Sequence, residues 1–146
     1  MKKLLLTLTF IFCASLAYAQ KTPNGVTYDA KILRVTDGDT VVISAAFLPK
    51  PLKPELAIRV FGVDTPEKGH RAKCSSEAER GQAASAFTKN MISQGSKFQV
   101  TMYGWDKFGG RVLGDILINE QSLRAALIAN GFAREYYGDA KQSWCK

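Results

Sequence analysis

The sequence predicts an α+β fold, a small five-stranded β-barrel with two or three packed helices. Three observations lead to this prediction: short segments that alternate apolar and polar residues, two segments with helical spacing, and a composition typical of globular proteins. The chain has 146 residues, of which 46% are hydrophobic and 23% are charged. These fractions exclude collagen-like, coiled-coil and wholly disordered chains. The length suits one domain with a sizeable core.

Residues 1–19 are predicted to form a signal peptide. Two lysines precede an apolar run over residues 4–16, and Ala17-Tyr18-Ala19 has the small-residue pattern at which signal peptidase cleaves. The run is too short to span a bilayer comfortably, and a membrane anchor is the less favoured alternative. We therefore expect residues 20–146 to form a single exported domain, periplasmic or secreted, with no membrane association after signal removal.

Cleavage before Gln20 changes the charge and the cysteine count. Two lysines and no acids leave with the signal, which lowers the formal charge from +7 to +5. An excess of Lys and Arg fits a polyanionic partner such as DNA or RNA, although basic exported proteins of unrelated function are common. Cys13 leaves as well, and the remaining Cys74 and Cys145 are expected to form a disulfide in an oxidising compartment. Two free thiols are the alternative.

Five strands are predicted from segments with a period of two or with short apolar runs. Between the second and the third, the three prolines of residues 49–54 exclude ladder pairing, so that this segment is a surface loop. The five predicted strands cover residues 26–35, 40–46, 56–63, 98–103 and 111–118.

Two helices are predicted. Ser76-x-x-Glu79 has the form of a capping box at the start of the first, and Gly95 ends it. Gly81, inside this span, costs the helix about 1 kcal/mol. The second helix covers residues 121–130. Five short strands, with a helix between the third and the fourth, fit a closed barrel with helices packed on it, which is the layout of the oligonucleotide-binding fold.

The residue types present exclude several kinds of catalytic site. His70 is the only histidine and lies in the cation-rich segment 68–73, so a solvated histidine is favoured over a buried catalytic base. That segment is either a mobile arm over a site or an ordinary loop. The two mature cysteines are too far apart in the sequence to form a zinc knuckle. Carboxylates, hydroxyls and arginines remain, and these residues serve hard-cation and phosphate chemistry.

Two carboxylate motifs follow predicted strands. Asp37-Gly38-Asp39-Thr40 joins the first two strands and, taken alone, is more typical of a plain turn. Arg59 precedes Asp64-Thr65-Pro66-Glu67; its side chain either points into a pocket or extends along the surface to solvent. Asp39 and Asp64, with a backbone carbonyl, could bind a divalent cation and leave Glu67 free to handle a proton.

A third motif, Asp106-Lys107-Phe108-Gly109-Gly110-Arg111, is by itself a hairpin with charged ends. The three motifs in this order, together with the intervening strands, resemble the staphylococcal nuclease family of calcium-dependent phosphodiesterases over about residues 28–137. Relative to the family, Gly110 is an insertion and Phe108 stands where tyrosine is common. By this resemblance the calcium ligands are Asp39, Asp64 and the carbonyl of Thr65; Glu67 activates or orients the attacking water; Arg59 and Arg111 bind the phosphate; and Lys107 and Tyr137 contact the substrate, with packing an alternative for Tyr137.

The sequence therefore predicts an exported, monomeric, Ca²⁺-dependent endonuclease that hydrolyses DNA and RNA with low sequence specificity. Magnesium or manganese could occupy the same oxygens. One alternative is a catalytically silent barrel that binds single strands through basic and aromatic groups. Another is a structural envelope protein, which leaves the carboxylates and arginines unexplained.

Overall fold

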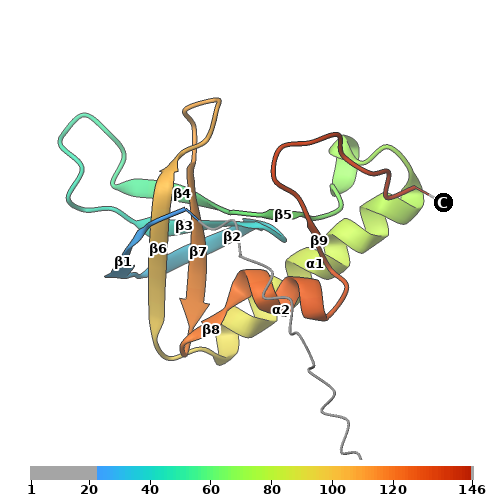
Figure 1. The fold of residues 1–146 in the computed structure, drawn as a ribbon. Helices are drawn as coiled ribbons and strands as arrows, with labels where there is room; N and C mark the ends of the chain where they lie inside the picture. The colour runs from blue at the N-terminus through green and yellow to red at the C-terminus, as the bar shows by residue number, and fades with distance from the viewer. Residues whose placement is uncertain (1–22, 146) are drawn as a thin grey trace, which may run out of the picture.

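The computed structural model describes residues 23–145, and the predicted signal peptide lies outside the described residues. None of the helices in this part of the chain is long and apolar enough to cross a bilayer. In chain order the elements are β1 (Val26–Asp29), β2 (Ile32–Asp37), β3 (Thr40–Ser44), β4 (Glu55–Val60), β5 (Val63–Asp64), the 3₁₀ helix η1 (Gly69–Arg71), α1 (Ser75–Gln94), β6 (Phe98–Trp105), β7 (Val112–Ile118), β8 (Gln121–Ser122), α2 (Leu123–Ala129) and β9 (Arg134–Glu135), as Figure 1 shows.

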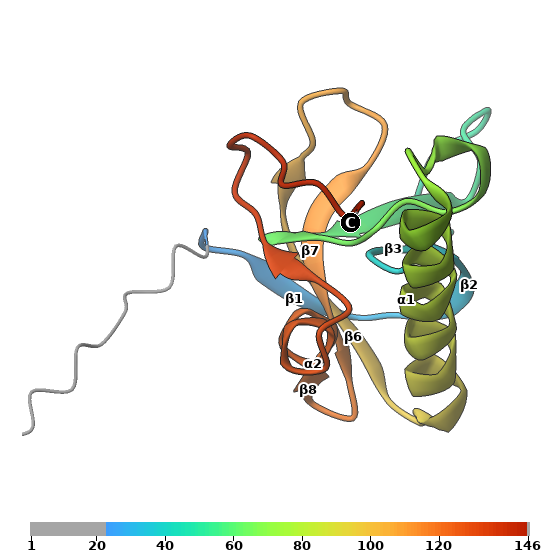
Figure 2. The same ribbon diagram turned by 90° about the vertical axis from the view of Figure 1, so that its right-hand side faces the viewer.

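The main sheet is mixed and open, so the predicted five-stranded closed barrel is wrong although the α+β class and both helices are correct. Its order is β1-β6-β7-β4-β3-β2, with β8 on β7, and a two-stranded sheet pairs β5 with β9. The predicted first strand is in fact two: β1 pairs with β6, and β2 pairs with β3. The chain changes its pairing partner at Ala30 and Lys31. The strands β1 and β2 at the two edges of the sheet are therefore connected by the backbone and not by hydrogen bonds between them (Figures 1 and 2).

The predicted third strand is also divided, because the chain turns at Gly62. This glycine has φ of +75°, and a Cβ there would lie 2.8 Å from Arg124 Nε. Beyond the turn, β5 leaves the main sheet and pairs with β9, with Asp64 opposite Arg134. The turn thus carries the Asp64 carboxylate away from the sheet and towards the C-terminal segment.

Helix α1 begins directly after Cys74, and the predicted capping box is wrong. No side chain caps the helix from that position. Instead, Glu77 is buried, and its Oε2 accepts a hydrogen bond of 2.7 Å from the backbone N–H of Lys73. On the buried face of the helix, Thr88 Oγ1 donates to Gly38 O at 2.6 Å. The Thr88 contact attaches α1 to the turn that carries Asp39.

Ser122 caps the N-terminus of helix α2. Ser122 Oγ accepts from Ala125 N at 3.0 Å and donates to the Asp115 carboxylate, which also accepts from Arg124 N at 3.2 Å. Burial raises the pKa of Asp115, although these donors oppose the shift. The core between the sheet and the helices is apolar, and its fully buried members are Val41, Ile58, Val60, Val63, Val100, Ile116, Leu123 and Leu127.

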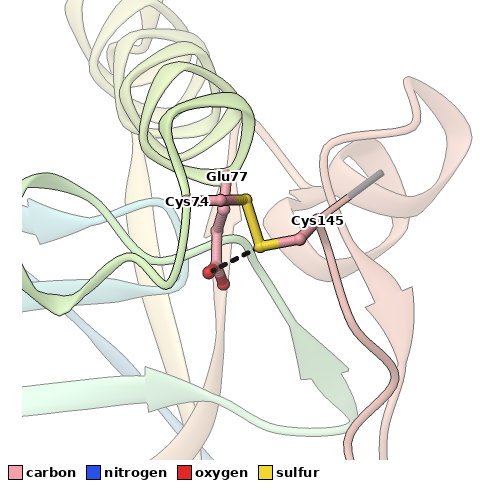
Figure 3. Close-up of side chains that lie close together, drawn as sticks. All are labelled: Cys74, Glu77 and Cys145. Atoms are coloured by element: carbon pink, nitrogen blue, oxygen red, sulfur yellow. Dashed lines mark hydrogen bonds between the residues drawn. A yellow bond between two sulfur atoms is a disulfide. The ribbon is translucent and has the colours of Figure 1, made fainter.

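The predicted disulfide between Cys74 and Cys145 is present and joins the start of α1 to the C-terminal segment (Figure 3). Cys145 Sγ lies 3.9 Å from Glu77 Oε2. Figure 3 draws this approach as a hydrogen bond, but a disulfide sulfur carries no hydrogen, so we describe it as a packing contact. The C-terminal residues are therefore fixed beside the loop that contains Glu67.

Candidate active site

A cavity of about 430 Å³ opens between the β4–β5 turn, the β6–β7 hairpin and the segment after β9. The hairpin and that segment rise on the same side of the sheet (Figure 2). Four of the residues predicted to bind substrate line this one cavity although they come from three separate parts of the chain. The charged and aromatic lining residues are Arg59, Lys107, Arg111, Lys141, Asp106, Phe61, Phe108, Tyr136 and Tyr137.

Arg59 links the cavity to the Asp39 carboxylate. Its Nη1 donates to Asp39 Oδ2 at 2.9 Å, and its Nη2 donates to Val63 O at 3.2 Å. The side chain is only 13% exposed, so the alternative in which Arg59 extends along the surface to solvent is wrong. Thr40 Oγ1 donates to the other Asp39 oxygen at 2.9 Å. The guanidinium is therefore held in one orientation, with part of its surface in the cavity.

The β6–β7 hairpin is ordered by Asp106. Its carboxylate accepts from the backbone N–H groups of Phe108 and Gly110, at 3.1 and 3.3 Å, and from Arg111 Nε at 2.9 Å. Burial alone would raise the pKa of Asp106, but the Arg111 guanidinium and the two amides outweigh it and lower this pKa. The inserted Gly110 thus supplies one of the donors that fix the turn, and Arg111 still lines the cavity.

Asp64 is buried under the C-terminal segment. Trp144 Nε1 donates to its Oδ2 at 3.0 Å. Lys141 Nζ lies 2.6 Å from its Oδ1, but the approach lacks hydrogen-bond geometry, and this buried oxygen has no hydrogen-bond donor within the described chain. We regard the contact as an ion pair, since the distance is short and the orientation is poor.

The donor set at Asp39 and Asp64 fits a hard divalent cation. Gly38 lies against the Thr65 side chain, since a Cβ on Gly38 would be 3.2 Å from Thr65 Cγ2, and so the segments carrying the two aspartates adjoin. Carboxylate and carbonyl oxygens are calcium ligands, and the buried Oδ1 of Asp64 accepts no hydrogen bond within the described chain.

The three carboxylates of the predicted site do not form one tight cluster. In residues 23–145, one set of three His, Cys, Asp or Glu side chains has its ligand atoms within 4.8 Å of one another, and this set is Cys74, Glu77 and Cys145. The sulfurs of that set are bonded to each other, so it is not available as a metal site. Asp39 and Asp64 are instead each neutralised by a side-chain cation.

Glu67 lies outside the cavity, on the side of the Asp37 turn. Its side chain is 39% exposed, and its Oε2 is 3.4 Å from Arg71 Nε. Arg71 also donates to Asp37 at 2.7 Å, and this hydrogen bond raises the pKa of its guanidinium. Within the segment 68–73, predicted as a loop or mobile arm, Gly69–Arg71 form the short helix η1, in which His70 is exposed.

Two backbone contacts fix the position of Glu67. Glu77 Oε1 accepts from its N–H at 3.4 Å. A Cβ on Gly81 of α1 would lie 2.6 Å from the Glu67 carbonyl carbon, so only glycine permits this approach of helix and loop. The glycine that weakens the helix in isolation therefore has a packing role beside the candidate site.

Tyr137 contributes to an aromatic wall of the cavity. Its ring lies 5.8 Å from that of Phe61, and its hydroxyl oxygen accepts from Arg124 Nη2 at 2.6 Å. Arg124 is itself buried, and its Nε has no partner within residues 23–145. The phenolic hydrogen remains available to a ligand because the hydroxyl acts as the acceptor in this bond.

Sequence reasoning missed three residues of the site: Glu77, Lys141 and Trp144. A signal for the last two was present, because a disulfide from Cys145 to Cys74 necessarily brings the C-terminal residues close to Glu67. No pattern in the sequence distinguished Glu77 from Glu79, the exposed acid of α1.

The chain belongs to the staphylococcal nuclease family. The family model, described as staphylococcal nuclease homologue, matches residues 57–144. The matched segment contains Arg59, Asp64, Glu67 and Arg111, and Asp39 precedes it. Members of this family generally hydrolyse nucleic acids, so the fold and the match together indicate a nuclease-type function with DNA or RNA as the partner.

Proposed function

We propose that this protein is an exported, Ca²⁺-dependent endonuclease that hydrolyses phosphodiester bonds in DNA and RNA with low sequence specificity. The observation that carries the proposal is the shared cavity of Arg59 and Arg111, in which Arg59 also contacts Asp39. Two guanidiniums in one cavity match the oxygens of a phosphodiester, because each presents a planar fork of N–H donors.

The two arginines bind and stabilise the negative charge of the phosphate. Arg59 and Arg111 donate to nonbridging phosphate oxygens, and their fixed orientation favours the extra negative charge that develops at phosphorus in the transition state. Arg59 is preorganised by Asp39 and Val63 O, and Arg111 by Asp106. Lys107 and Tyr137, which also line the cavity, contact the neighbouring parts of the strand.

The carboxylates divide into two roles. Asp39, Asp64 and the carbonyl of Thr65 would hold Ca²⁺, which supplies positive charge to a phosphoryl oxygen when bound. Glu67 accepts a proton at its carboxylate or orients the attacking water. Its partial exposure keeps the carboxylate accessible to that water. The family resemblance implies that the 5′ oxygen leaves and that a 3′-phosphate results.

Features outside the site support the proposed export and partners. The disulfide supports an oxidising compartment, and residues 1–19 have the pattern of a signal peptide. The mature chain keeps a basic excess that favours a polyanionic substrate. We propose a periplasmic or secreted monomer that has no membrane association after signal removal.

Digestion of plasmid DNA and of single-stranded RNA by residues 20–146 tests the proposal. We expect cleavage of both with calcium, loss of cleavage with a chelator, and a fall of about 10²-fold or more in rate for Glu67→Gln. Glu79→Gln, at an exposed position of α1, is the matched control and should retain activity. Binding of both nucleic acids without cleavage would favour the silent binding module, and cleavage with magnesium or manganese but not calcium would overturn the metal assignment.

A further inference from the structure

The C-terminal segment, residues 141–145, is anchored beside Asp64 at several points. Trp144 is buried, its indole donates to Asp64, and the Arg134 guanidinium stacks 3.7 Å from the centre of its ring. Arg134 Nη1 also donates to Ser143 O at 3.0 Å. With the disulfide at Cys145, these contacts fix where the segment lies and leave little freedom in its path.

Lys141, at the start of this segment, faces two environments. Its Nζ forms the 2.6 Å ion pair with Asp64 Oδ1, and its side chain also lines the cavity that contains Arg59 and Arg111. The lysine side chain is 47% exposed, whereas the Asp64 side chain is only 8% exposed. The mobile member of the pair is therefore the lysine, because its ammonium can move into the cavity while the carboxylate stays buried.

The ion pair with Lys141 occupies Asp64 Oδ1, an oxygen that the proposed function needs as a calcium ligand. Asp64 Oδ1 is the orphaned carboxylate oxygen, and Lys141 is the cation that faces it. A divalent cation on that oxygen would repel the ammonium, since two positive charges would share one carboxylate. The cation and Lys141 therefore compete for Asp64.

The cavity offers a displaced ammonium only one other anion. Asp106 is the sole acid among the lining residues, all of which lie within the described chain, and its carboxylate is engaged by Arg111 and two backbone amides. A phosphate held by the two arginines would supply the missing partner, because an ammonium is a compact donor that binds phosphate oxygens.

We propose that Lys141 is a displaceable counter-ion: it neutralises Asp64 in the absence of metal and turns to the substrate phosphate when a divalent cation takes Asp64. This inference rests on the proposed function. It assigns Lys141 as a further substrate-binding residue and couples the two ligands, so that cation and nucleic acid each strengthen the binding of the other.

Calcium titration by isothermal calorimetry, without nucleic acid, tests the competition. We expect Lys141→Met to bind calcium about 1.5- to fivefold more tightly than the wild type, the range expected of a half-exposed ion pair. Lys141→Arg, which keeps the charge, should resemble the wild type. Lys97→Met is the matched control, because it removes a lysine paired with Glu120 at 3.6 Å at the opposite end of β6 and β7, and it should leave the calcium affinity unchanged.

Binding of a single-stranded DNA oligonucleotide, measured in the Glu67→Gln background to prevent cleavage, tests the second half of the proposal. Calcium should raise the affinity for DNA about 1.5- to fivefold more when Lys141 is present than in the variant that also carries Lys141→Met. An unchanged or weaker calcium affinity of Lys141→Met, or an equal calcium effect on DNA binding, would overturn the role of Lys141. Absence of calcium-dependent cleavage by the wild type would instead overturn the proposed function, whatever the calorimetry gives.

Discussion

Arg59 both lines the cavity and contacts the Asp39 carboxylate. It donates to Asp39 through one guanidinium nitrogen and to Val63 O through the other, and it still lines the cavity. A single side chain can do this because the guanidinium carries five N–H donors in a rigid plane. A lysine has the same charge but only one nitrogen, so it cannot make both contacts and keep the same orientation.

Arg59→Lys is therefore expected to lower kcat/KM for DNA cleavage by about 10²-fold or more, as removal of a preorganised charge stabiliser commonly does. Steady-state kinetics with saturating calcium provide the measurement. Arg34→Lys is the control, because Arg34 forms an exposed ion pair with Glu55 on the same sheet at 2.7 Å. Kinetics of Arg59→Lys equal to those of the control would contradict the assignment of Arg59.

At the scale of elements, the contact between α1 and the loop before η1 sets the position of Glu67. Gly81 permits the helix to approach the Glu67 backbone, and Glu77, one turn earlier, binds the N–H groups of Glu67 and Lys73. A glycine in a helix interior normally weakens it, so its presence here reflects the close approach and not the helix itself.

Gly81→Ala places two effects in opposition. The helix gains about 1 kcal/mol in propensity, but the new Cβ meets the backbone of Glu67 and forces a shift that costs about 1–3 kcal/mol. We expect a net loss of unfolding free energy and a marked fall in kcat, measured by urea denaturation and by DNA cleavage. The exposed neighbour Gln82, changed to alanine, should lose neither; a stabilised and fully active Gly81→Ala protein would refute the contact.

At the scale of the whole molecule, the disulfide connects the C-terminus to the middle of the chain. It closes a loop with a sequence separation of 71 residues and fixes the segment that contacts Asp64. A cross-link over so long a loop restricts the unfolded chain strongly, which is the main source of its stabilisation in the chain-entropy model.

Reduction of the mature protein is expected to lower the unfolding free energy by about 4 kcal/mol. Urea unfolding with and without reductant measures this difference. The double variant Cys74→Ser, Cys145→Ser should already have the lower stability and should not respond to reductant. A loss of less than about 1 kcal/mol on reduction would show that the contacts of Trp144 hold the segment without the bond.

The sequence predicted the strands and helices well where the pattern was local. Alternation of residues fixes that a segment is extended, but it does not fix the partner, and so one predicted strand became β1 and β2 on opposite edges of the sheet. The prediction of a closed barrel was wrong for the same reason. Strand pairing is a non-local choice, made here by the change of partner at Ala30 and Lys31.

The candidate site was predictable to the extent that motifs carry it. The motifs around Asp39, Asp64 and Arg111 predicted the staphylococcal nuclease family, and the match of the family model confirms that prediction. Lys141 was not predictable in this way, because its approach to Asp64 depends on the disulfide and on the β5–β9 pair. Residues brought in by tertiary structure leave no local signature in the sequence.

The segments that line the cavity come in a definite order along the chain. Two of its walls, the β6–β7 hairpin and the residues after Tyr136, come from the last third of the chain. A polypeptide that crosses a membrane with its N-terminus first would deliver these walls last, and Cys145 could find Cys74 only after translocation. If the protein is exported as proposed, the bond that fixes the segment beside Asp64 would therefore form only in the oxidising compartment, so that this side of the cavity would be completed after export.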